Sequence, residues 1–147
     1  MLKWVDKHEP ETLARTRYMM HLKDHLYYKL TGIVSTDSTD QSLVFINMNT
    51  RAYNDELFKL YGLEKYRDRF PQIIESADSA KPVQAGLAEE LGLSGNTLVT
   101  NGSMDVAACA VGAGVVGDGD CSIIGTAAIH EMVINKQYSD IRLPDLR

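Results

Sequence analysis

The fold class that the sequence predicts is α/β, because two different patterns follow one another along the chain. As far as about residue 96 the sequence is charged and divided into short helical patterns, which are bounded by residues that cap helices. From there on it reads as a short strand, a helix of small apolar residues and two strands joined by a glycine turn. We therefore predict two pieces, residues 1–96 and residues 97–147, with a boundary near residue 96.

The first piece is predicted to contain short helices, each with a recognisable start or stop. Its opening residues already have an amphipathic helical pattern with no capping residue before them, so the sequence looks like part of a longer protein. Proline suits the first turn of a helix, and Asp, Asn and Gly set the other boundaries. The predicted helices are 1–5, one opening at Pro10, His25 to Leu30 between Asp24 and Thr31-Gly32, one from Asn54 through Tyr61 to Gly62, and Val83 to Leu91 before Gly92.

Other parts of the first piece allow more than one interpretation. The polar run Thr36 to Ser42 is typical of a capped turn, and it could instead line a cleft. Leu43 to Ile46 fits a short strand or a buried turn, and residues 67–81, which include Pro71, resemble a loop. Trp4 is predicted to be buried in a core or an interface.

The second piece is predicted to be a strand, a helix and a hairpin. Its helix is apolar on nearly every side, which predicts that it is buried. About 50 residues would have difficulty in forming a complete core alone. The predicted elements are a strand at Thr97 to Thr100, a turn at Asn101-Gly102-Ser103, a helix at Met104 to Val115, and strands at Cys121 to Ile124 and Ala127 to Ile134 on either side of Gly125-Thr126.

Composition excludes several kinds of partner. The chain has 147 residues, 44% of them hydrophobic and 24% charged, as in a soluble globular protein. A net charge of −5 argues against nucleic acid or an anionic membrane, because phosphate surfaces require clustered Lys and Arg. The longest apolar run, Val106 to Val116, is about half of what spans a bilayer, and we find no signal-peptide pattern. We therefore expect a cytoplasmic protein.

Neither a metal site nor a disulfide is predicted. None of the four histidines has a zinc-like spacing to a cysteine. His21 and His25 lie four residues apart, and we interpret them as surface residues beside a helix start. Cys109 and Cys121 lie among apolar residues, so both are predicted to be small buried core residues.

Asp105 is the first candidate for chemistry. It follows a predicted strand and a Gly-Ser turn and begins a helix, and strand ends in α/β sheets are where ligands bind. A helix N-terminus favours the charged form of a carboxylate, which could take a proton from a hydroxyl during phosphoryl transfer. An ordinary helix cap explains the position equally well.

Gly125-Thr126 is the second candidate. A Gly-Thr turn between two strands presents backbone N–H groups and a hydroxyl, and such groups can bind phosphate oxygens. Taken alone, the pair is better explained as a plain hairpin.

The spacing of these two candidates resembles the FGGY family of carbohydrate kinases. The run Asn101-Gly-Ser-Met-Asp105-Val-Ala-Ala-Cys-Ala-Val-Gly-Ala-Gly114 is similar to the family's Gly-Gly-x-Asp-Asn-Ala-Ala segment and the helix after it. Ile123-Ile-Gly125-Thr126-Ala is similar to its Leu-Gly-Thr-Ser phosphate turn. Upstream, Leu2-Lys3-Trp4-Val5, Leu22-Lys23-Asp24-His25-Leu26 and the stretch Thr36 to Ser42 resemble further family segments in the same order.

The resemblance implies a fragment of the two-domain actin-like ATPase fold of sugar kinases, Hsp70 and actin. Residues 1–96 would be the C-terminal part of the first, sugar-binding domain, and residues 97–147 the N-terminal part of the second, nucleotide-binding domain. Family members transfer the γ-phosphate of ATP, as its Mg²⁺ complex, to a sugar or polyol hydroxyl. Asp105 would then be the general base, and Gly125 and Thr126 would contact the transferred phosphate.

One departure from the family concerns the substrate. The residue after the base is usually an Asn or Gln that holds sugar hydroxyls, and here it is Val106, which has no donor or acceptor. This favours a ketose or polyol kinase of the L-xylulose kinase kind over the commonest xylulose or glycerol type.

The resemblance also implies what the chain does alone. As a fragment it is expected to be inactive, and to form homo-oligomers through uncovered sheet edges. The alternative function is a non-catalytic actin-like module for assembly or interaction.

Overall fold

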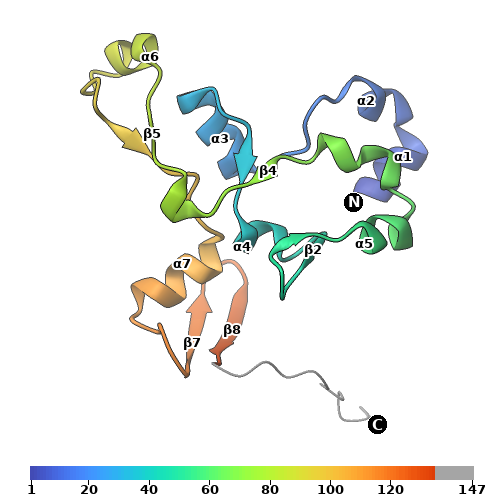
Figure 1. Cartoon of the computed structure of the whole chain (residues 1–147). Helices are drawn as coiled ribbons and strands as arrows, with labels where there is room; N and C mark the ends of the chain where they lie inside the picture. The colour runs from blue at the N-terminus through green and yellow to red at the C-terminus, as the bar shows by residue number, and fades with distance from the viewer. Residues whose placement is uncertain (135–147) are drawn as a thin grey trace. The chain divides into compact units, whose positions relative to one another are not determined.

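The structure, a computed structural model, describes residues 1–134. These fall into two compact units, the first ending at Ser103 and the second beginning at Met104. Both units mix helices and short strands, as expected for α/β (Figure 1). The division into two actin-like domains at residue 96 stays a prediction.

The first unit is mainly short helices. Two of its boundaries are those predicted, because the Asn54 side chain accepts from the Glu56 N–H at 2.9 Å and Gly62 ends the helix at a φ of 66°. The helices are α1 (Leu2–His8), α2 (Pro10–Arg15), α3 (Leu22–Thr31), α4 (Ser38–Gln41), α5 (Asp55–Tyr61) and α6 (Ala85–Glu90), with 3-10 helices η1 (Glu64–Arg69) and η2 (Ser76–Asp78).

The start of α3 differs from the prediction. The N-cap residue is His21, and Asp24 is the third helical residue. The Asp24 carboxylate reaches back and accepts from the His21 N–H at 3.2 Å, which forms a capping box. The prediction that Asp24 caps a helix at His25 is therefore wrong by one turn, although the helix ends at Gly32 as expected, with a φ of 77°.

Three two-residue strand pairs hold the first unit together. β1 (Ser35–Thr36) pairs in parallel with β4 (Gln72–Ile73). β2 (Ile46–Asn47) and β3 (Ala52–Tyr53) are antiparallel, as are β5 (Lys81–Pro82) and β6 (Leu98–Val99). The stretch predicted to be a loop, residues 67–81, thus contains the end of η1, all of β4 and η2, and the first residue of β5. Its strand residues pair with partners distant in the sequence.

An aromatic cluster forms the core of the first unit. Phe45 and Phe58 stack with ring centroids 4.1 Å apart, and Phe70 meets Phe58 edge-on at 5.0 Å. Leu13, Leu63 and Tyr66 complete the buried set. Trp4 does not join it: its side chain is 56% exposed and stacks on His8.

The second unit is one helix followed by one hairpin, as predicted (Figure 1). The strand predicted to precede them at Thr97 to Thr100 is β6, which lies in the first unit and pairs with β5. α7 (Asp105–Gly112) begins one residue later than expected, and β7 (Gly119–Ile124) pairs antiparallel with β8 (Ala128–Val133). The predicted burial is wrong. Among its described residues α7 buries only Ala110, Cys109 is exposed and Cys121 is partly exposed. One helix and two strands provide too few layers to cover a helix on every side.

No helix within residues 1–134 is both long enough and apolar enough to span a membrane.

Replacing Phe58 should destabilise the first unit strongly. Phe58 is 1% exposed and packs against three other aromatic rings, so Phe58→Ala should cost about 3–5 kcal/mol of unfolding free energy. Urea unfolding followed by circular dichroism measures this. The matched control is Leu60→Ala in the same helix, where the side chain is 73% exposed; its cost should be within about 0.5 kcal/mol. Equal costs for the two variants would contradict the assigned core.

Candidate functional site

Asp105 is the first residue of α7, and its side chain is exposed. Its Oδ1 accepts from the Val106 N–H at 2.8 Å. The N-cap residue is Met104, whose side chain makes no capping hydrogen bond. The carboxylate thus lies beside the free N–H groups of a helix start, which stabilise negative charge, and it remains open to a reacting group.

Gly125 and Thr126 lie in the turn between β7 and β8, between the paired residues Ile124 and Ala128. Both are exposed, and the Gly125 N–H donates to the Ala127 carbonyl at 3.0 Å. The position is the predicted one, and the exposed turn leaves the Thr126 hydroxyl accessible. The turn and Asp105 belong to the same unit, in which α7 packs on β7.

A buried charge cluster in the first unit was not predicted. The Lys23 Nζ lies 2.9 Å from Asp24 Oδ1, 2.7 Å from Asp37 Oδ1 and 3.0 Å from Asp40 Oδ2. The side chains of Asp24 and Asp37 are 0% and 1% exposed, and that of Lys23 is 24% exposed. The three protons of the ammonium can therefore each meet one carboxylate. We call these four residues the Lys23 cluster.

The cluster shifts the pKa values of two of its members, Lys23 and Asp37. Burial alone would lower the pKa of the Lys23 ammonium, but its hydrogen bonds to the three carboxylates outweigh burial and raise the pKa. Burial alone would raise the pKa of the Asp37 carboxyl, but hydrogen bonds from Lys23 and Thr39 lower it on balance. Both shifts favour the charged forms of Lys23 and Asp37.

The polar run Thr36 to Ser42 supplies two of the three carboxylates of the Lys23 cluster, those of Asp37 and Asp40. Asp37 caps α4, with its Oδ2 accepting from the Thr39 N–H at 2.9 Å. The run is a capped turn, as the first interpretation had it, yet most of it is buried. Thr36 and Asp37 are 0% exposed, and Gln41 is 1% exposed. The spacing of two aspartates around a Ser-Thr pair could have indicated the cap, but nothing local indicates Lys23 as the partner.

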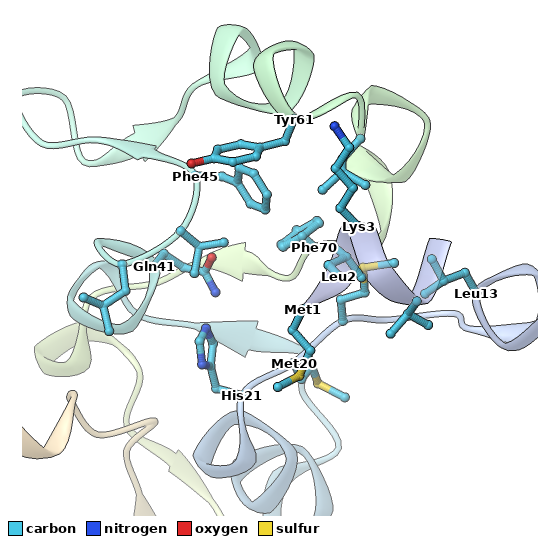
Figure 2. Close-up of a pocket in the computed structure, with 15 residues that line it drawn as sticks. Met1, Leu2, Lys3, Leu13, Met20, His21, Gln41, Phe45, Tyr61 and Phe70 are labelled. Atoms are coloured by element: carbon cyan, nitrogen blue, oxygen red, sulfur yellow. The ribbon is translucent and has the colours of Figure 1, made fainter. Parts of the chain in front are cut away.

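A cavity of about 700 Å³ opens beside this run in the first unit (Figure 2). Its walls are largely apolar, and Phe45, Phe70 and Met20 are among them. Gln41 and His21 are polar exceptions in the lining. The Gln41 Nε2 donates to Thr36 Oγ1 at 3.3 Å, whereas its Oε1 has no hydrogen-bond partner.

Residues 1–134 contain no group of three or more His, Cys, Asp or Glu side chains suited to a metal ion. His25 is exposed on α3, and His21, the N-cap residue of that helix, is partly exposed.

The fold is that of sugar kinases. A crystal structure described as a xyloylose kinase from Brucella ovis superposes with a TM-score of 0.76 at 31% identity, covering 88% of this chain and 27% of that one. Residues 1–112 match the N-terminal domain of the FGGY family of carbohydrate kinases, and the chain belongs to this family.

Two sequence relatives are informative. An erythritol kinase from Brucella abortus is 38% identical over 142 residues, which is 95% of this chain and 27% of the relative. A xylulose kinase from Staphylococcus epidermidis is 33% identical over 141 residues, or 94% of this chain and 27% of the relative. The chain therefore spans about a quarter of the length of these relatives.

Removing the Lys23 ammonium should reverse the pH dependence of stability near this cluster. In the native chain the lowered pKa of Asp37 contributes stability that is present above the unfolded pKa of about 4 and is lost as the pH falls further. In Lys23→Met three carboxylates face one another without a cation. This variant should lose stability at pH 7, toward the lower end of about 3–5 kcal/mol, and should regain part of it between pH 7 and pH 4 as carboxylates protonate.

Urea unfolding at a series of pH values measures both effects. Lys29→Met is the matched control, because Lys29 is an exposed lysine on the same helix. Its pH dependence should follow that of the native chain. A Lys23→Met curve that coincides with the native one at every pH would show that the cluster contributes nothing to stability.

Proposed function

We propose that the complete enzyme to which this chain belongs transfers the γ-phosphate of ATP to a hydroxyl group of a sugar or polyol. The observation that carries the proposal is membership of the carbohydrate kinase family, with 38% identity to an erythritol kinase across nearly the whole chain. Phosphoryl transfer depends mainly on positioning and on stabilisation of charge, and the exposed groups of the second unit suit both tasks.

Asp105 is the proposed general base. As the substrate oxygen attacks the γ-phosphorus, its proton passes to a carboxylate oxygen of Asp105 and the bond to ADP breaks. A base in this role must be ionised and accessible. Asp105 is exposed at the first position of α7, and a helix N-terminus favours a charged carboxylate.

Gly125 and Thr126 are the proposed phosphate contacts. A glycine in an exposed turn lets phosphate oxygens approach the backbone closely, and the Thr126 hydroxyl adds one donor. Magnesium would arrive as part of the ATP complex, held largely by phosphate oxygens and water.

Val106 is proposed to favour a polyol acceptor. It is partly exposed directly after Asp105 and cannot hydrogen-bond a substrate hydroxyl. A substrate that needs one hydrogen bond fewer at this point, such as a short linear polyol, loses the least binding free energy. The name of the relative from Brucella abortus, erythritol kinase, supports this choice.

A cytoplasmic location is proposed as well, since both cysteines are unpaired.

Replacing the proposed base should remove catalysis and leave nucleotide binding. In the complete enzyme, Asp105→Asn should lower kcat by about a hundred- to ten-thousandfold, with KM for ATP nearly unchanged, because the base acts on the acceptor hydroxyl. A coupled assay of ADP release, run with erythritol, other polyols and pentuloses, measures this. The control is Asp78→Asn, an exposed aspartate on η2.

Near-normal turnover of Asp105→Asn on the best substrate would refute the role of Asp105. If the native enzyme phosphorylates no member of the panel, a non-catalytic actin-like module becomes the better explanation.

The 147-residue chain alone should be inactive and should self-associate, forming a homo-oligomer. One face of the β7–β8 hairpin carries Ile124 and Met132, which are 85% and 68% exposed, and strand register places both on the same side. Such faces and open strand edges favour association. Light scattering at micromolar concentration should give a mass above that of a monomer. The double variant Ile124→Lys, Met132→Lys should shift toward monomer, whereas Leu60→Lys should not. A native monomer, or a chain with kinase activity, would contradict this.

A further inference from the structure

The side chain of Asn101 occupies the carboxyl end of the parallel β1–β4 pair. Its Nδ2 donates to the carbonyl oxygen of Thr36 at 3.1 Å and to that of Ile74 at 2.7 Å. The Ile74 N–H also donates to the Thr36 carbonyl, at 2.9 Å. Asn101 is 2% exposed, so one amide group uses both of its protons to join the two strand ends out of contact with water.

The backbone around Asn101 is held as firmly as its side chain. The Asn101 N–H donates to Ser79 Oγ at 2.9 Å, and the Ser76 hydroxyl donates to the Gly102 carbonyl. Ser79 is itself fixed, because its carbonyl accepts from the Tyr27 hydroxyl at 2.6 Å and its own hydroxyl donates to the Ser76 carbonyl at 2.9 Å. Every partner belongs to the first unit.

Gly102 sets the direction in which the chain leaves this point. Its φ is 71°, a left-handed value that costs glycine little and other residues more. An added Cβ would meet only the Lys23 Cδ, at 3.9 Å, so backbone conformation and not space requires glycine. The next residues are Ser103 and Met104, and then Asp105 begins α7.

We propose that Asn101 is a positioning residue for Asp105. Its hydrogen bonds hold Asn101 against the ends of β1 and β4, shortly before the helix that carries the proposed base. Only Gly102, Ser103 and Met104 lie between Asn101 and Asp105 in the sequence. The inference rests on the proposed function, since it gives Asn101 a role in catalysis through Asp105 and no contact with substrate.

Asn101→Asp in the complete enzyme tests this inference. The substitution keeps the shape of the side chain but replaces the donor that faces two carbonyl oxygens with an acceptor. The expected result is a fall of about ten- to a hundredfold in kcat per folded molecule, as for misplacement of a catalytic group. KM for ATP should stay within about twofold, since ATP binding does not depend on this base. Asn96→Asp, the same change at an exposed asparagine, should leave kcat unaltered.

A double-mutant comparison separates positioning from mere stability. If Asn101 acts through Asp105, Asn101→Asp should cause no further loss of kcat in an Asp105→Asn enzyme. An undiminished kcat per folded molecule, or an additional loss in the Asp105→Asn background, would overturn the inference. If Asn101→Asp does not fold, Ser76→Ala decides by the same two criteria, because it removes only the hydrogen bond to the Gly102 carbonyl.

The two proposals fail in different ways. Full activity of Asp105→Asn refutes the proposed base, whatever Asn101 does. An inactive Asp105→Asn together with a fully active Asn101→Asp refutes only the positioning role.

Discussion

The ammonium group of Lys23 is the interaction on which the arrangement of the first unit depends most. It meets three carboxylates within 3.0 Å, and these come from α3, from the cap of α4 and from α4 itself. Charges buried in this way stabilise a fold only when every partner is present, because an unpaired buried carboxylate is costly. The cluster therefore specifies one arrangement of α3 against the turn after β1.

Hydrogen bonds link this turn to Asn101, which lies shortly before Asp105 in the sequence. Asp37, which Lys23 holds, follows Thr36, and the Thr36 carbonyl accepts from both the Ile74 N–H and the Asn101 side chain. The charge cluster, the parallel strand pair and the segment before Asp105 are thus one connected polar network. Polar networks of this kind are favourable when fully satisfied and costly when one member is lost. Within the first unit, the network complements the separate aromatic core around Phe58.

Local features of the structure could be read from the sequence, and distant pairings could not. The Asn54 cap, the glycine at the end of α5 and the β7–β8 hairpin depend on neighbouring residues, so their patterns identify them. Asp24 was misplaced by one turn because a His N-cap is a weak signal.

Predictions of a second kind were wrong because the structure of a segment depends on residues far away along the chain. The strand β4 inside a proline-containing stretch pairs with β1, more than thirty residues earlier. The apolar pattern of α7 predicted burial, but burial depends on which layers cover the helix and not on its own sequence. For the candidate site, the residue types and local positions of Asp105 and Gly125-Thr126 could be predicted from the sequence. It could not indicate that Asn101, a residue of the turn before the helix, is held by Thr36 and Ile74.

Amide hydrogen exchange, measured residue by residue on the 147-residue chain, tests the central claim that this polar network holds the first unit together. The account expects the N–H groups of Ile74 and Asn101, which donate into the network at 2.9 Å each, to exchange as slowly as that of Phe58 in the aromatic core. They should open only with global unfolding. Exchange at Ile74 and Asn101 near the rate of an exposed amide, while Phe58 stays protected, would show that the network opens independently and would contradict the account.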